Sequence, residues 1–297
     1  MKKGIIGLLL IAFLVVLIGF LFKKEYFTLV PLQEEKIIEL NDIKIISFQT
    51  NATDIEITSG SSNHILVKLE GKIAQSFKHK YHINIEELNN QLKISFLPNA
   101  DSLGIKFGGE KDLTLQITLP ERTYEELLVQ TTSGDINTEN ITAKNMEIIS
   151  DSGDQIVKNL NTTAVSSMMS TSGSIKIEHG AMENFLIESI SGDVEMQELI
   201  SQRGQAKTSS GDITAGMKKI LNELDIVTTS GDVAATFKEK PKSLKVNFKG
   251  DSGKPSIQLE DIISKDIGEN HAIVVIGEGD KTLTVTTTSG DFTLKQK

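Results

Sequence analysis

The residues with the clearest capacity for chemistry are the aspartates of a recurring Ser-Gly-Asp tripeptide. From residue 130 onwards eight Ser-Gly pairs occur, and aspartate follows six of them. Carboxylates repeated at a regular spacing could hold calcium, which takes roughly six to eight oxygen ligands. One carboxylate per repeat, without the Gly-Gly-x-Gly-x-Asp nonapeptide of calcium-binding β-rolls, instead favours aspartates that accept backbone N–H bonds in their own turns. The six aspartates are Asp135, Asp154, Asp193, Asp212, Asp232 and Asp291, and Ser174 and Lys254 occupy the other two places.

Catalytic chemistry finds little support in the sequence. Enzymes that cleave polysaccharides on parallel β-helices need paired acids, with a base or cation, converging in a groove. Aspartates that belong to a regular repeat single out no such pair, and arginine occurs only as Arg122 and Arg203. No Gly-x-Ser-x-Gly, His-Glu-x-x-His or Walker motif is present. We therefore predict that the protein is not an enzyme and has no catalytic, cofactor-binding or metal-binding residues.

Two shorter patterns also have simple structural explanations. His79 and His82 are the only histidines close in sequence. On a strand their odd spacing places them on opposite faces, and the flanking Lys78 and Lys80 would repel a cation, so a solvated edge is favoured over a metal site. The tripeptide Lys249–Asp251 matches a short adhesive motif, but its glycine already occupies a small-residue position of the repeat. We treat the match as coincidence.

The composition excludes several further classes of protein. The 297 residues include 31 Lys and Arg against 40 Asp and Glu, a formal net charge of −9. Four of the lysines lie within residues 1–24, so the remainder is more acidic still. A phosphate-binding surface needs clustered basic residues, so we predict no nucleic-acid partner, and repulsion of phosphate-rich polymers and anionic lipid unless a divalent cation bridges them. The absence of cysteine excludes disulfides, thiol catalysis and Cys-ligated metal sites.

The chain begins with a predicted membrane anchor. Residues 4–22 contain no charged or strongly polar side chain, and as a helix they would span about 28 Å, close to the thickness of a bilayer. Lysine pairs flank this run at residues 2–3 and 23–24, and no small-residue cleavage site ends it, so an uncleaved anchor is favoured over a signal peptide. We assign residues 1–24 to a single-pass anchor in the cell membrane, with the bulk of the chain extracytoplasmic.

The chain beyond the anchor is predicted to be all-β. Apolar and polar residues alternate over Ile43–Ile46, Asp54–Ile57 and Leu113–Leu119, which is the period of half-buried strands. Strands at irregular spacing make residues 25–122 an N-terminal β-rich region. From residue 123 to residue 297 the spacing becomes regular, and this part is predicted to be a separate β-solenoid.

The regular spacing is an internal repeat of about 19–20 residues. The Ser-Gly glycines are 19 to 22 residues apart until the last interval of 37, which suggests one repeat without its marker and a stack of nine rungs. Residues five and three before each glycine, and two and four after it, are mostly apolar or small and are predicted to point inward. A leucine-rich repeat would need a periodic Leu-x-x-Leu-x-Leu, which is missing. The position three before the glycine holds Thr131, Ser150, Ser170, Ser189, Thr208, Thr228, Gly250 and Thr287.

The first and last repeats also carry a family resemblance. The runs Leu127–Ile136 and Leu283–Phe292 look like the bacterial "putative adhesin" β-repeat domains of unknown function. With the predicted anchor, the chain resembles the LiaG-type membrane proteins of Firmicutes cell-envelope stress operons over roughly residues 35–297. The resemblance implies a β-repeat architecture and a place in envelope-stress signalling, and it brings no active-site residues.

These observations favour a noncatalytic protein anchored in the membrane. We expect an extracytoplasmic β-solenoid that binds an envelope protein or a wall polymer, with the cell membrane contacted through residues 4–22. An adhesin or structural scaffold at the cell surface is the main alternative, and a polysaccharide-acting enzyme is less favoured. Neither a cofactor nor an oligomeric state is indicated by the sequence.

Overall fold

The structure is a computed structural model that describes residues 28–296, except 41, 76–77, 79–80 and 98–109. The predicted anchor at residues 4–22 lies outside the described residues. Among the residues that are described, no helix is long and apolar enough to cross a membrane. The described chain is built from strands, as predicted, and contains no α-helix.

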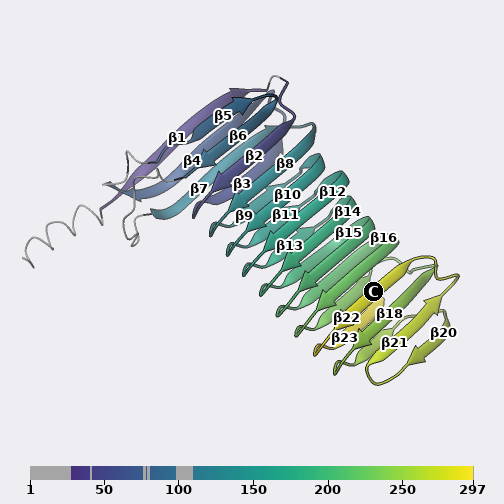
Figure 1. The fold of residues 1–297 in the computed structure, drawn as a ribbon. Helices are drawn as coiled ribbons and strands as arrows, with labels where there is room; N and C mark the ends of the chain where they lie inside the picture. Colours follow the sequence, from purple (N-terminus) through teal and green to yellow (C-terminus); the bar gives the residue numbers. More distant parts are fainter. Residues whose placement is uncertain (1–27, 41, 76–77, 79–80, 98–109, 297) are drawn as a thin grey trace, which may run out of the picture.

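The strands follow one another along an elongated stack (Figure 1). At the N-terminal end are β1 (Leu29–Glu39), β2 (Ile45–Thr50), β3 (Asp54–Gly60), β4 (His64–Ala74), β5 (Asn84–Leu88), β6 (Gln91–Phe96) and β7 (Glu110–Pro120). The body contains β8 (Thr123–Thr131), β9 (Ile136–Glu139), β10 (Thr142–Ser150), β11 (Gln155–Lys158), β12 (Asn161–Ser170), β13 (Ile175–Glu178), β14 (Ala181–Ser189), β15 (Val194–Thr208), β16 (Ile213–Thr228) and β17 (Val233–Phe237). The C-terminal end contains β18 (Leu244–Gly250), β19 (Pro255–Gln258), β20 (Ile262–Ile267), β21 (His271–Ile276), β22 (Thr282–Thr287) and β23 (Phe292–Gln296).

In the body, each repeat forms one rung of a parallel β-solenoid. A rung is a pair of strands joined by a tight corner, which contains the Ser-Gly motif in every repeat. Strand β10 pairs in parallel with β8 and β12, and β11 pairs in parallel with β9 and β13. The long strands β15 and β16 each run from one rung into the next, and they pair with each other over both. The predicted parallel β-solenoid is confirmed.

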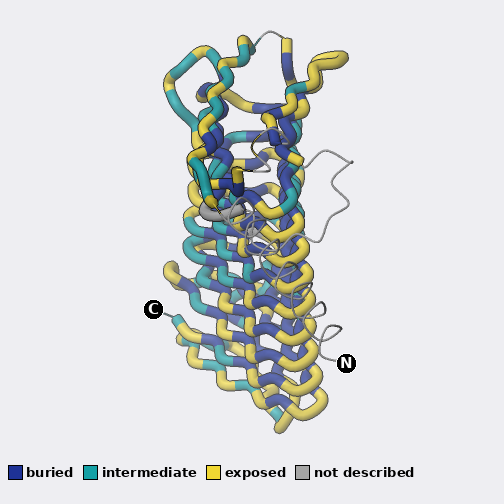
Figure 2. The backbone as a smooth tube through the Cα atoms, turned by 90° about the vertical axis from the view of Figure 1, so that its left-hand side faces the viewer, coloured by how far each residue is buried: buried dark blue, intermediate teal, exposed yellow. Residues whose placement is uncertain are grey.

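The inward positions are also those predicted from the repeat. The residues five and three before the corner glycine are buried at all eight corners. Those two and four after it are buried as well, except Pro255 and Ile257, which are half-buried. Within each column the residues pair in register, so that Ile148 lies between Val129 and Met168. Figure 2 shows the result as buried positions alternating along the strands, with exposed residues gathered at the bends.

The C-terminal rung breaks the order of the chain. Strand β22 pairs in parallel with β16 on one side and β18 on the other, and β23 lies between β17 and β19 in the same way. Residues 282–296 are therefore inserted between two rungs that precede them in sequence (Figure 1). The predicted rung between Gly253 and Gly290 is wrong. That segment instead forms β20 and β21, which pair antiparallel and extend the sheet from β18.

Pro255 provides a physical reason for this order. The backbone N–H two residues after a corner glycine donates to a carbonyl of the next rung, as from Ile213 to Asp232 (2.9 Å) and from Phe292 to Lys254 (3.0 Å). Proline has no N–H to donate, so a rung stacked beyond Pro255 would lose this bond. The rung of β18 and β19 therefore suits the last place in the stack, and the C-terminal segment enters before it.

The N-terminal end repeats this arrangement. Strand β2 lies between β6 and β8, and β3 lies between β7 and β9, all in parallel pairs. The solenoid thus gains two rungs from the predicted β-rich region, and strand pairing continues without a break across residues 122 and 123. The division of the chain there remains a prediction. Ten rungs are present among the described residues, and at about 4.8 Å per step they extend about 43 Å.

Candidate functional site

The corners of the stack carry two columns of polar side chains, and the inner column is structural. At seven of the eight corners a buried hydroxyl three residues before the glycine accepts a hydrogen bond from the glycine N–H, as at Ser189 and Gly192 (2.9 Å). In the middle of the stack the same hydroxyl donates to the glycine carbonyl of the preceding rung, as from Ser189 to Gly173 (3.2 Å). The hydroxyls therefore satisfy backbone groups that burial would otherwise leave unpaired. The N–H bond recurs from Thr131, Ser150, Ser170, Thr208, Thr228 and Thr287.

The glycines are required by space and not by conformation. Glycine often supplies a backbone conformation that a side chain would oppose, but no corner glycine here has a positive φ. Each glycine instead lies directly against the carbonyl of the neighbouring rung. A Cβ atom at Gly211 would come within 2.1 Å of the Gly192 carbonyl oxygen. At these eight corners the rungs can approach to their normal spacing only because the glycine has no side chain.

The outer column is the aspartate column, and its carboxylates link successive rungs. Asp135 accepts the backbone N–H of Asp154 (2.9 Å), and Asp212 accepts that of Asp232 (2.8 Å). The expectation that each aspartate bonds within its own turn is therefore wrong in detail, because the acceptor serves the next rung. Asp54 extends the column by accepting the N–H of Asp135. The same bond is made by Asp154, Asp193, Asp232 and Asp291.

This bonding argues against a calcium site in the aspartate column. One oxygen of each of these carboxylates is already engaged by a backbone N–H, whereas calcium takes roughly six to eight oxygen ligands. Among the described residues, no three His, Cys, Asp or Glu side chains converge so that they could hold a metal ion. The aspartates therefore act as rung-to-rung caps in the structure.

Calcium should accordingly leave the thermal stability of the full chain in detergent unchanged. A ligand present at 100 times its Kd would add about 2.7 kcal/mol. For a chain of this size that corresponds to a rise in Tm of several degrees. The measurement is one comparison of the melting curve in excess calcium with the melting curve in excess chelator. A reproducible rise of several degrees with calcium would show that the column binds metal.

The other residues considered from sequence do not converge. His79 lies outside the described residues, and His82 is exposed, with Nδ1 3.9 Å from a carboxylate oxygen of Glu34. Arg122 lies over the ring of Tyr124, 4.9 Å from its centroid, and donates to the backbone carbonyl of Ile43. No catalytic pairing arises from these contacts.

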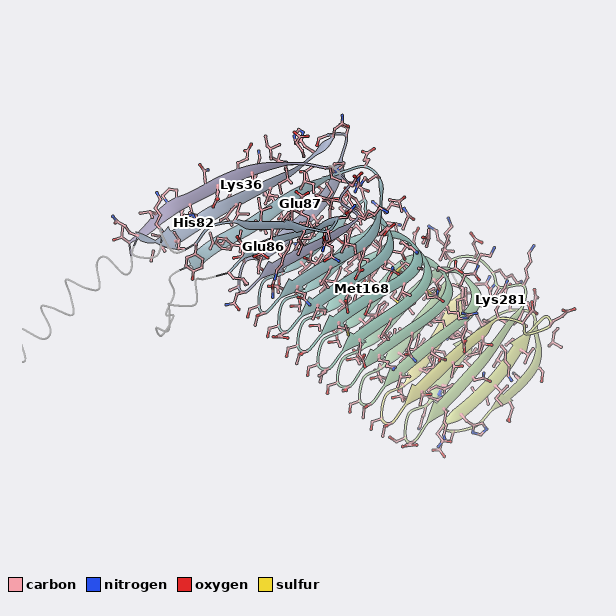
Figure 3. The ribbon with its side chains drawn as sticks, turned by 45° about the horizontal axis from the view of Figure 1, so that its top comes forward. Lys36, His82, Glu86, Glu87, Met168 and Lys281 are labelled. Carbon is pink, nitrogen blue, oxygen red and sulfur yellow. The ribbon has the colours of Figure 1, made fainter. Side chains whose placement is uncertain are left out.

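A cluster of lysines near the C-terminal end was missed by the sequence reasoning. Lys218 and Lys219 lie in β16, Lys240 and Lys242 lie between β17 and β18, and Lys281 lies just before β22. Together they line a cavity of about 250 Å³ whose floor is formed by buried apolar side chains. We call these five residues the lysine pocket. Figure 3 shows Lys281 toward the C-terminal end of the stack, well away from Lys36 and His82 in the N-terminal sheet.

The lysine pocket exists because the C-terminal rung is inserted out of order. After β17 the chain does not form the next rung of the stack. It continues past that position to form β18, and it returns through residues 277–281 to form β22 in the position left between them. Backbone bonds join these segments, from Lys238 to the Met217 carbonyl (3.0 Å) and from Lys245 to the Lys281 carbonyl (2.7 Å). Lysines spread over more than sixty residues of sequence thereby meet at one edge.

Only one of the five lysines is neutralised by an ion pair. Lys240 contacts Asp261 (2.7 Å) and Glu260 (3.0 Å), and these carboxylates hold the pKa of Lys240 above its usual value. Within the described part of the chain, no carboxylate lies within 4.0 Å of the ammonium groups of the other four. The lining contains a single acidic residue, Glu239. The nearby Asp280 accepts a hydrogen bond from Ser243, which lowers the pKa of Asp280.

Known proteins resemble this chain both in sequence, through a family model, and in fold, through solved structures. A family model described as Toastrack DUF4097 matches residues 43–295. A solved structure from Bacteroides fragilis NCTC 9343, described as a "putative adhesin", is 14% identical with a TM-score of 0.52, covering 92% of this chain and 99% of that one. A second "putative adhesin", from Parabacteroides distasonis ATCC 8503, is 14% identical with a TM-score of 0.50, covering 90% and 97%. At this identity the likeness shows the fold alone. No curated protein matches the sequence.

Proposed function

Because the chain belongs to the Toastrack DUF4097 family, we propose that it is a noncatalytic, membrane-anchored β-solenoid that binds an envelope component outside the cytoplasm. The observation that carries this proposal is the structural use of the polar side chains in the stack. The polar groups at the corners are engaged in hydrogen bonds between neighbouring rungs. What remains for function is a rigid surface about 43 Å long. Such a surface suits recognition better than catalysis.

The solved relatives and the sequence support the proposal at different levels. Two structures with this fold are described as "putative adhesin", which is compatible with binding at a surface. The apolar run at residues 4–22 supports anchoring, with the solenoid exposed to the envelope. The link to envelope stress rests on the resemblance to LiaG-type proteins. An envelope ligand would be recognised on the solenoid and reported at the membrane through the anchor.

Protease accessibility in wall-stripped cells tests the topology. We expect protease added to intact protoplasts to digest residues 25–297, because these residues are proposed to lie outside the membrane. A cytoplasmic protein should survive the same treatment, and it should be digested only after the cells are permeabilised. Full protection of the solenoid in intact protoplasts, with digestion on permeabilisation, would overturn the extracytoplasmic placement.

Crosslinking in intact cells separates binding from a purely mechanical scaffold. A photoreactive residue on the exposed surface of the solenoid should yield a discrete adduct with one envelope protein or polymer. The same residue placed at a buried column position, such as Met168, provides the background. A scaffold that only holds a surface away from the membrane would give no adduct above that background.

A further inference from the structure

The lysine pocket is a local exception to the acidic character of the protein. The chain carries a net charge of −9, and this average predicts repulsion of phosphate-rich polymers. Yet the segment 218–249 contains seven lysines, whereas the 87 residues before it, 131–217, contain four. Screening confines the influence of distant charges to about 8–10 Å, so a ligand at the pocket responds to the nearby lysines. At this edge five lysines stand against the carboxylates of Glu239, Glu260, Asp261 and Asp280, so the local balance is positive although the whole chain is negative.

The size and lining of the pocket indicate a small anionic group. A volume of about 250 Å³ is below the range of roughly 300–1,000 Å³ that encloses drug-sized ligands. Lysine ammonium groups act as point charges on phosphate oxygens, and this contact does not need the fork of arginine, which binds carboxylate and phosphate alike. No arginine lies in the lining, and in the described part of the chain four of its five lysines make no ion pair within 4.0 Å. These features fit a phosphate group entering from solvent.

A lipid headgroup fits the pocket less well than a polymer. Proteins that dock on a bilayer insert exposed apolar side chains beside their basic residues. Three apolar residues of the lining, Ile220, Phe237 and Leu244, are at most 3% exposed and form the floor, and the fourth, Pro241, is half-buried. The exposed Ile263 lies beside the pocket, in an adjacent cavity lined also by Lys240 and Lys242. A single isoleucine is far less than the apolar face that a membrane-docking helix buries. A phosphate carried on a flexible chain can reach the lysines without such an anchor.

We propose that the lysine pocket binds a phosphate group of a phosphodiester polymer in the envelope. This inference rests on the proposed binding function and names its ligand class. Lys218, Lys219, Lys242 and Lys281 supply the positive charge, while Lys240 is paired with Glu260 and Asp261. The site forms only when β22 and β23 occupy their inserted place in the stack.

Binding of a defined polymer to the full chain in nonionic detergent tests the proposal. The probe is poly(glycerol phosphate), with polyglutamate as a carboxylate polymer and phosphatidylglycerol vesicles as a lipid source of phosphate. We compare a pocket variant, Lys218→Ala/Lys242→Ala/Lys281→Ala, with a control variant, Lys93→Ala/Lys144→Ala/Lys207→Ala. Both variants lose three positive charges. The pocket variant should bind the polymer about tenfold or more weakly, and the control should stay within about threefold of the unaltered chain.

Several outcomes would overturn the inference. Equal loss in the two variants would show that overall charge and not the pocket governs binding. Equal affinity for polyglutamate would remove the preference for phosphate, and binding to vesicles without binding to the polymer would assign the pocket to lipid. No binding of any probe would also overturn it. Such a failure is distinguishable from failure of the proposed function, because protease accessibility and crosslinking do not depend on the pocket.

Discussion

Replacing Ser189 with leucine should destabilise the solenoid by about 4 kcal/mol, from two effects of comparable size. Ser189 is 2% exposed, and its hydroxyl oxygen lies 2.9 Å from the Gly192 nitrogen. Leucine would overpack a closed corner, at a cost of about 1–3 kcal/mol. It would also leave the buried Gly192 N–H without an acceptor, at a further cost of about 1–3 kcal/mol. The measurement is the urea midpoint of the variant relative to the unaltered chain.

The neighbouring position provides the control for this substitution. Glu188 precedes Ser189 on the same strand and points to the outside of the stack, where it is half-buried. Glu188→Leu introduces the same side chain one residue away and should change stability by no more than about 0.5 kcal/mol. If both leucine variants lose stability equally, the assignment of inner and outer faces is incorrect.

Replacing Gly211 with alanine should cost about 3 kcal/mol or more, at the upper end of overpacking effects. The new Cβ atom would lie 2.1 Å from the Gly192 carbonyl oxygen and 2.6 Å from its carbonyl carbon. Both are backbone atoms of the neighbouring rung, so the clash can be relieved only if two rungs move apart. The midpoint of urea unfolding, followed by circular dichroism, measures the loss.

Gly180 offers a matched alanine substitution without this clash. A Cβ atom there would meet the flexible Leu199 side chain at 3.2 Å and the Leu160 carbonyl oxygen at 3.4 Å. The change in chain entropy of the unfolded state is the same for both substitutions. Gly180→Ala should therefore cost less than about 1 kcal/mol. A Gly211→Ala variant as stable as Gly180→Ala would mean that the rungs are not in contact at the corner.

The register of the stack could be predicted because burial alternates along each strand and repeats down each column. A single inward column, from Val129 to Val285, is apolar in every repeat, and only one face of a strand can satisfy that pattern. The hydroxyl column was recognised as small, but its hydrogen bonds were not foreseen. Spacing gives the side on which a residue lies, whereas the partner of a hydroxyl depends on the corner geometry.

The order of the rungs could not be predicted from the same pattern. All rungs share one chemistry, so the repeat alone does not say which rung lies beside which. The signal that was available is Pro255, which cannot donate to a following rung. The sequence also conceals the rung of β2 and β3. Its residues Thr50, Asp54 and Ile55 correspond to Thr131, Asp135 and Ile136 of the next rung, but Thr53 occupies the position of the glycine that marks the repeat.

The lysine pocket illustrates the same difficulty for the candidate site. Its members appear in sequence as two short groups, Lys218-Lys219 and Lys240-Pro241-Lys242, and as the isolated Lys281. Averaged over an acidic chain they are inconspicuous, and their meeting depends on a long-range strand insertion. The lysine groups indicate that a basic edge could exist, but they do not indicate where in the fold it lies.

The most direct test is a pair of engineered disulfides, because the rung order creates the pocket and the chain has no cysteine of its own. Thr286 is the register partner of both Val227 and Lys249. Neighbouring strands lie about 4.8 Å apart, within disulfide reach, whereas Val227 and Lys249 are separated by two steps, about 9.6 Å. We predict that oxidised Val227→Cys/Thr286→Cys forms an intramolecular disulfide and that Val227→Cys/Lys249→Cys does not. The reverse result would place the rungs in chain order and contradict both the inserted rung and the pocket built on it.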